Sequence, residues 1–121
     1  MRFLNSAMHA VRGLLYCFQH EKNFLVQFVL AVIVFFAGIF FGLTSQEWLA
    51  ILLSTAIVLG MEIINTAIER LCDVITTSIH PAIKQVKDIA AGGVLLVSAI
   101  SLATGCIIFI PRIISIIKKI S

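Results

Sequence analysis

Charged residues are scarce in this chain of 121 residues. Asp, Glu, Lys and Arg together make up 12% of the sequence, whereas apolar residues make up 60%. A soluble domain usually carries about twice this share of charged residues, about 25%. Long runs without charge therefore indicate that lipid surrounds much of the chain. The length leaves room for one domain, which we expect to cover residues 1–121.

Other features that would define a class of protein are missing as well. Cys17, Cys72 and Cys106 lie far apart, so neither a disulfide framework nor a Cys/His metal site is expected. The basic residues are scattered singly, which argues against a nucleic-acid partner. Residues 1–20 lack the compact apolar core of a signal peptide. Neither a Walker-type G-x-x-x-x-G-K-[ST] motif nor a kinase-type Gly-rich loop is present.

The apolar residues form four helical segments. Residues 1–20 alternate apolar and polar faces at three- and four-residue steps, which predicts an amphipathic helix lying on the membrane surface. Residues 24–43, 48–72 and 88–110 are apolar enough to cross about 30 Å of hydrocarbon. We expect residues 73–87 to form a polar connector and Pro111 to end the last span. The predicted fold class is an all-α membrane protein with one surface helix and three transmembrane helices.

The distribution of basic residues predicts the orientation in the membrane. The N-terminal segment and the 73–87 connector lie on one side and hold six of the nine basic residues, which are Arg2, Arg12, Lys22, Arg70, Lys84 and Lys87. The rule that basic residues stay inside puts this side in the cytoplasm. Arg112, Lys118 and Lys119 are a counter-signal on the other side. We therefore expect a multi-pass protein of the inner (cytoplasmic) membrane.

Acidic residues gather at the side assigned to the cytoplasm. Five of the six lie there: Glu21, Glu62, Glu69, Asp73 and Asp88. Because a charged side chain at the bilayer centre costs at least about 2.5 kcal/mol, such residues usually have a partner or a function. Glu62, Asn65 and Glu69 stand at positions i, i+3 and i+7 and so share one helix face, which Asp73 extends. Carboxylate and amide oxygens suit Mg²⁺, although polar residues that only hold helices together would give a similar pattern.

The depth of these residues suggests where a reaction would occur. Glu62 follows the interfacial Trp48 by 14 residues, which is about 21 Å at about 1.5 Å per residue. It therefore lies past the midplane, and Glu69 lies at or beyond the inner boundary. A lipid hydroxyl and a soluble phosphate donor could meet along this stripe.

These residues carry a resemblance to a known family. The run M-E-I-I-N-T-A-I-E-R-L-C-D (residues 61–73), followed by K-D-I-A-A-G (residues 87–92), resembles the small prokaryotic integral-membrane diacylglycerol kinases, a family that includes the undecaprenol kinases. The segment H-E-K-N-F (residues 20–24) is similar to the first acidic motif of that family. The resemblance covers nearly the whole chain.

The resemblance implies a homotrimer whose active sites form between subunits at the cytoplasmic interface. Glu62 would be the general base that takes the proton of the lipid hydroxyl, with Asn65 beside it, and Glu21 and Glu69 would hold Mg²⁺ with ATP. Nucleotide contacts would come from Arg2, His9, Glu21, Glu69, Ser78, Ile79, His80, Lys87 and Asp88. Ala91 would lie with Glu62 at the lipid site, and Asp73 would support the cluster.

The lipid acceptor stays open at this point. Gln27 stands where the diacylglycerol-specific branch tends to carry an acid, and His80-Pro81 and K-D-I-A-A-G look more like the undecaprenol kinase branch. We therefore expect an ATP-dependent kinase of undecaprenol, with diacylglycerol as the alternative acceptor. A small proton-coupled transporter and a non-catalytic helper subunit are the rival hypotheses. A transporter's coupling residues usually lie near the midplane, whereas this stripe runs out to one interface.

Overall fold

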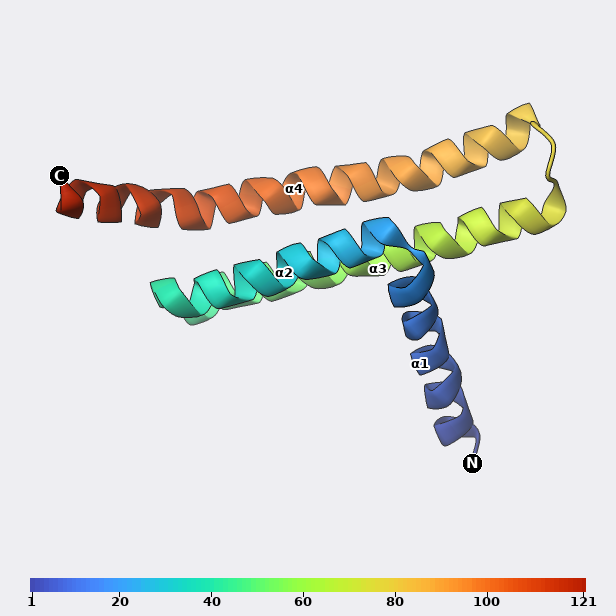
Figure 1. Ribbon diagram of the computed structural model, residues 1–121, viewed down its shortest axis with the longest axis horizontal. Coiled ribbons are helices and arrows are strands. Elements are labelled where there is room, and N and C mark those ends of the chain that lie inside the picture. The colour runs from blue at the N-terminus through green and yellow to red at the C-terminus, as the bar shows by residue number, and fades with distance from the viewer.

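The computed structural model describes residues 1–121, and it is entirely helical (Figure 1). Its four helices are α1 (Arg2–His20), α2 (Lys22–Phe41), α3 (Ser45–Ile75) and α4 (Pro81–Ile120). The helices α2, α3 and α4 lie side by side as an antiparallel bundle, from which α1 projects steeply (Figure 1). These three bundle helices are each long and apolar enough to cross a membrane. The chain is thus an all-helical membrane protein.

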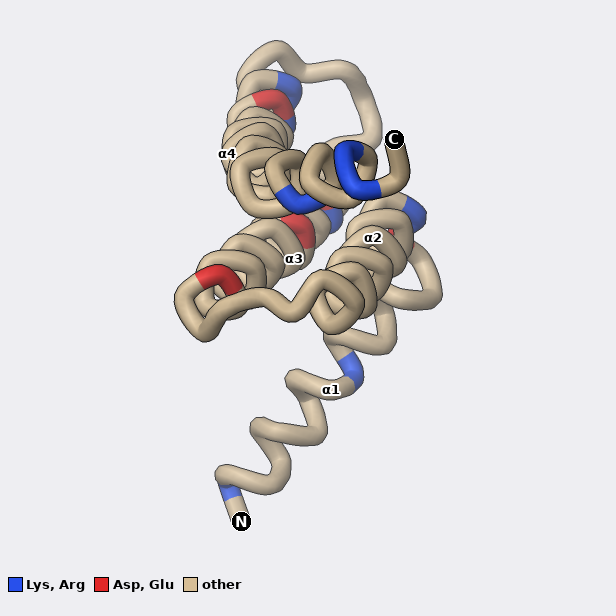
Figure 2. Tube along the Cα trace, turned by 90° about the vertical axis from the view of Figure 1, so that its left-hand side faces the viewer, with Lys and Arg blue, Asp and Glu red and all other residues tan.

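The helix α3 is the centre of the bundle, because α2 and α4 both pack against it. Only ten of the 121 residues are buried, and the apolar core is a small cluster of Leu43, Ile51 and Ile108. Figure 2, which looks along the bundle, shows charges as short bands on otherwise uncharged helices. So much exposed apolar surface needs lipid or protein around it.

A tight turn joins α2 to α3. Gly42 adopts the left-handed conformation, with φ of 65°, which a residue without a Cβ enters at no steric cost. Thr44 then caps α3, since its hydroxyl accepts a hydrogen bond from the Glu47 amide at 3.2 Å and the Glu47 side chain accepts one from the Thr44 amide at 3.0 Å. Close packing follows: a Cβ added at Gly38 would lie 2.7 Å from the indole of Trp48.

The expectation that Pro111 ends the last span is wrong. The helix α4 continues through Pro111 to Ile120. Proline removes one backbone hydrogen bond, but a helix in apolar surroundings keeps its remaining backbone groups paired, so prolines are tolerated in such helices. Arg112 also fixes this region, because its guanidinium binds both carboxylate oxygens of Glu47 across 65 residues of sequence. Arg112 therefore belongs to the bundle and not to a free tail.

The connector between α3 and α4 is shorter than the predicted 73–87 segment. The helix α3 runs on to Ile75, and α4 already begins at Pro81. Pro81 occupies the first helical position, where its missing N–H costs nothing. The His80 ring caps this helix, since its Nδ1 accepts a hydrogen bond from the Ala82 amide at 3.2 Å. Asp73 and Lys87, both placed in the connector, instead lie on facing helices.

Candidate functional site

A polar stripe lies on the buried face of α3. The buried residues of this helix are Ile51, Val58, Glu62, Thr66 and Cys72, which recur at helical spacing and so belong to one face. Glu62 is only 6% exposed and Thr66 only 5% exposed, although both are polar. No cationic side chain pairs with Glu62. A buried carboxylate without such a partner is costly, and this marks the position as a candidate for function.

Asn65 extends the stripe by one turn. Its side-chain nitrogen donates a hydrogen bond to Oε1 of Glu69 at 3.2 Å. Its carbonyl oxygen Oδ1 is buried and has no hydrogen-bond partner. An unsatisfied buried acceptor normally has a donor or a cation to bind. The structure therefore places a free oxygen on the side chain that binds Glu69, about one helical turn from Glu62.

Glu21 brings a third carboxylate from a different element. It is the extended residue between α1 and α2, with φ of −111° and ψ of 103°, and its amide donates to the carbonyl of Cys17. Glu21 and Glu69 are both near enough to repel the charge of Glu62. A carboxylate with two like charges near it would gain from a bound cation or a shared proton.

The carboxylates do not by themselves form a closed metal cage. No three His, Cys, Asp or Glu side chains are close enough together to hold a metal ion. Mg²⁺ does not require this, since it usually binds one or two carboxylates together with phosphate oxygens and waters. A Mg²⁺ site completed by phosphate oxygens and waters fits the oxygen atoms present here, which are the carboxylates of Glu69 and Glu21 and the unpaired Oδ1 of Asn65.

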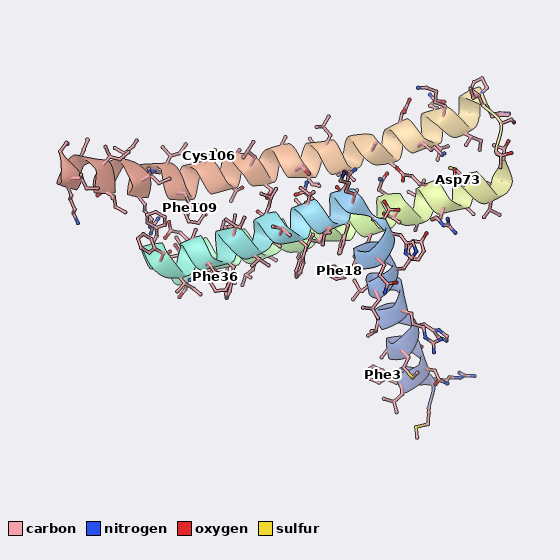
Figure 3. All side chains as sticks on the ribbon, viewed as in Figure 1. Phe3, Phe18, Phe36, Asp73, Cys106 and Phe109 are labelled. Carbon is pink, nitrogen blue, oxygen red and sulfur yellow. The ribbon has the colours of Figure 1, made fainter.

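Ion pairs lie beyond the stripe, at the same end of the bundle. The Lys87 ammonium contacts the Asp73 carboxylate at 2.7 Å and so joins α4 to α3, and Figure 3 shows Asp73 on the last turns of α3 near the loop. Lys84 and Asp88 form an exposed pair at 2.7 Å within α4. We call this end, with Glu21, Glu62, Glu69, Asp73 and Asp88, the acidic end of the bundle.

Residues of the α3–α4 loop, three of which were predicted to bind nucleotide, are open to solvent. Ser78 is held by Thr76, whose hydroxyl lies 2.8 Å from that of Ser78 and accepts the Ser78 amide at 3.1 Å. Ile79 is 94% exposed. The loop thus exposes Ser78, Ile79 and His80 at the end of the bundle where Lys87 pairs with Asp73.

Other predicted site residues are not brought together within one chain. Arg2 and His9 lie on the part of α1 that projects from the bundle, the region of Phe3 in Figure 3. Ala91 is exposed on α4. A single chain therefore brings Glu21 and Glu69 near Glu62, with Asn65 bound to Glu69, and it leaves Arg2 and His9 apart from them.

Two features of the site were not predicted from the sequence. Thr66 is as buried as Glu62 and lies one turn further along the same face; its spacing of four residues from Glu62 could have revealed it. The guanidinium of Arg70 lies 5.5 Å from the centre of the Tyr16 ring and so holds α1 against α3 by a cation–π contact. No local pattern connects residues so far apart.

Comparison with known proteins decides the family. The model of the family "Prokaryotic diacylglycerol kinase" matches residues 8–109, which is most of the chain. The chain belongs to the prokaryotic diacylglycerol kinase family. Undecaprenol kinase of Bacillus subtilis is 38% identical over 93% of this chain and 91% of its own length.

Two diacylglycerol kinases are also similar. That of Synechocystis is 30% identical over 93% of this chain and 65% of its own length. That of Haemophilus influenzae is 29% identical over 77% of this chain and 79% of its own length. Membership in this family makes the protein an ATP-dependent lipid kinase, and it favours that activity over the transporter and the helper subunit.

Proposed function

We propose that this lipid kinase transfers the γ-phosphate of ATP to the hydroxyl of undecaprenol and so yields undecaprenyl phosphate. The observation that carries the proposal is the buried Glu62, which lacks a cationic partner and shares one helix face with Asn65 and Glu69. The bond between the γ-phosphorus and the bridging oxygen of ADP breaks, and a bond from that phosphorus to the lipid oxygen forms. The hydroxyl proton passes to Glu62.

Glu62 acts in this reaction as the general base. Phosphoryl transfer requires in-line positioning and stabilisation of charge, with little covalent chemistry by the protein. A carboxylate that is 6% exposed meets few waters, so a lipid hydroxyl that enters the site would be its main proton donor. Asn65 lies beside the base and orients the reacting groups through its unpaired Oδ1.

Glu69 and Glu21 would hold Mg²⁺ with ATP. The unpaired oxygen of Asn65 and the repulsion of Glu62 by Glu21 and by Glu69 support this assignment. When bound, the ion would neutralise charge on the phosphates. Further nucleotide contacts would come from Ser78, Ile79, His80, Lys87 and Asp88 around the α3–α4 loop. Asp73 would hold the Lys87 ammonium in place through their 2.7 Å contact.

The complete site would require more than one chain. Arg2 and His9 lie away from the acidic end of their own bundle. The Arg2 and His9 side chains of a neighbouring copy would therefore have to supply these contacts to the nucleotide. Ten buried residues are also few for a chain with an intramembrane carboxylate. We propose a homotrimer in the cytoplasmic membrane, with α1 on its inner surface and the acidic end facing the cytoplasm. The six basic residues on that side support this orientation.

Diacylglycerol remains the second candidate acceptor. It is favoured by the similarity to the two diacylglycerol kinases, which match this chain at 29% and 30% identity. The higher identity to an undecaprenol kinase, 38%, supports undecaprenol. In either case Ala91 would lie beside the lipid, because it is exposed on α4 near the acidic end.

One assay tests both acceptors. Purified protein is given ATP labelled at the γ-phosphate and Mg²⁺, in mixed micelles that contain either undecaprenol or diacylglycerol. We expect label in undecaprenol, and Glu62→Gln protein serves as the control for background transfer. Stronger labelling of diacylglycerol would reverse the acceptor assignment, and the absence of label in both lipids would contradict the proposed reaction.

A further inference from the structure

The helix α4 is too long to end with the rest of the bundle. Its 40 residues measure about 60 Å at about 1.5 Å per residue, whereas a bilayer with its headgroup regions is about 40–45 Å thick. The Glu47–Arg112 ion pair marks where the start of α3 lies beside α4. From residue 113 to Ile120 every residue of α4 is exposed, and Figure 1 shows this end past the α2–α3 turn. We call residues 113–120 the C-terminal extension.

The C-terminal extension has one apolar face and one basic face. At about 100° per residue, its isoleucines fall within an arc of about 160°. Lys118, Lys119 and Ser115 occupy the opposite side of the helix. A helix with such an apolar face and lysines on the other is typical of the membrane interface. The isoleucines of this face, all of them exposed, are Ile113, Ile114, Ile116, Ile117 and Ile120.

The extension begins at the level of the membrane surface. Glu47 and Arg112 form a charged pair there, and Trp48 follows at the position of an interfacial aromatic side chain. If α4 ran straight on from this level, the isoleucines would stand in water. Pro111 lies at the base of the extension and has no N–H, so α4 can bend there without losing a further backbone hydrogen bond. Such a bend lays the isoleucine face on the hydrocarbon boundary.

The charges of the extension indicate which kind of surface it binds. Lys118 and Lys119 line one shallow depression together with Pro111, Ile114 and Ser115. Neither lysine forms an ion pair. The one acidic residue at this end of the bundle is already bound to a guanidinium. Two free ammonium groups above an apolar face are complementary to a lipid surface that carries negatively charged phosphates.

The dimensions of the extension argue against a second copy of the chain as its partner. Helices that associate as a coiled coil usually keep their apolar repeat over at least about three heptads. The extension covers residues 113–120, which is little more than one heptad. The seam of a coiled coil is also narrower than the arc of about 160° that the isoleucines cover. A lipid surface sets neither limit, because it can contact the whole of a wide and short apolar face.

We propose that the C-terminal extension binds the anionic lipid surface of the membrane on the side opposite the acidic end. Its isoleucine face enters the boundary of the hydrocarbon, and Lys118 and Lys119 bind lipid phosphates. The contact holds α4 at a fixed depth in the membrane. It is independent of the lipid that accepts the phosphoryl group. The match to the kinase family ends at residue 109, so the contact lies outside the matched part of the chain.

Hydrogen exchange measured by mass spectrometry tests this contact in the full chain. The protein is placed in nanodiscs of phosphatidylcholine, with or without phosphatidylglycerol, and peptides that cover residues 113–121 are followed. A free helix end frays and exchanges fast. We expect phosphatidylglycerol to slow exchange by about fivefold for each lysine, or about 25-fold for both. The difference should disappear in about 1 M salt, where the screening length is about 3 Å.

Two sets of variants separate the basic face from the apolar face. Lys118→Gln combined with Lys119→Gln keeps the helix propensity and should abolish the effect of phosphatidylglycerol. Arg12→Gln combined with Lys84→Gln removes the same charge from exposed positions elsewhere and should leave the effect intact. Ile117→Ser should speed exchange in both kinds of nanodisc, because it puts a hydroxyl on the apolar face. Ile117→Leu is its matched control and should behave as wild type.

Each other outcome overturns the inference. Exchange that is equally slow in both kinds of nanodisc and in detergent would assign the isoleucine face to a second copy. Exchange that is equally fast in both kinds of nanodisc would mean that the extension stands free in water. Slowing by inorganic phosphate in neutral nanodiscs would assign the lysines to a soluble anion. Loss of the lipid effect in the Arg12 and Lys84 control would mean that only the net charge of the protein matters.

Discussion

Replacing Glu62 by Gln separates a catalytic role from a structural one. Gln keeps the size and shape of the side chain, so the packing around a residue that is 6% exposed should survive. The substitution removes the negative charge that Glu21 and Glu69 repel. The folded protein is therefore expected to be as stable as wild type or more stable, whereas it loses its proton acceptor.

The loss of activity can be estimated from the role of the group. A positioned general base typically contributes about 100-fold to 10,000-fold in rate. At about 1.36 kcal/mol for each factor of ten, this corresponds to about 3–5 kcal/mol of activation free energy.

The measurement pairs kinetics with stability in one preparation. Label transfer from ATP gives kcat, and the midpoint of thermal unfolding in detergent gives stability. Glu62→Asp is the companion variant, because it keeps a carboxylate at a shorter reach and should retain more activity than Glu62→Gln. A loss of less than tenfold in kcat by folded Glu62→Gln protein would refute the base assignment. A loss of activity that only follows unfolding of the variant would refute it as well.

Three further substitutions test the metal site and the packing. Glu69→Gln should raise the Mg²⁺ concentration needed for half-maximal transfer, and an unchanged Mg²⁺ titration would contradict the metal role. Gly38→Ala puts a Cβ 2.7 Å from the Trp48 ring and should lower the unfolding midpoint, whereas Gly60→Ala, which meets no atom within 4 Å, should leave it unchanged or raise it. Arg112→Ala leaves the Glu47 carboxylate without its partner and should lower the unfolding midpoint. Adding Glu47→Gln to Arg112→Ala should recover part of that loss in the same unfolding assay.

Much of the candidate site could be predicted because it is local. Glu62, Asn65 and Glu69 share a face as soon as the segment is helical, since a helix repeats every 3.6 residues. The apolar runs likewise predict three spanning helices, because each run must satisfy its own backbone hydrogen bonds in lipid. These features require no knowledge of how the helices pack.

The sequence by itself therefore determined the class of protein, the number of long apolar helices and the acidic stripe. Only the tertiary structure decided that the stripe lies on the buried face of α3 and that Arg112 pairs with Glu47. It also decided that α4 runs through Pro111. The physical reason is that helical periodicity is set by neighbours three and four residues away. The register between antiparallel helices depends instead on contacts between side chains as much as 65 residues apart.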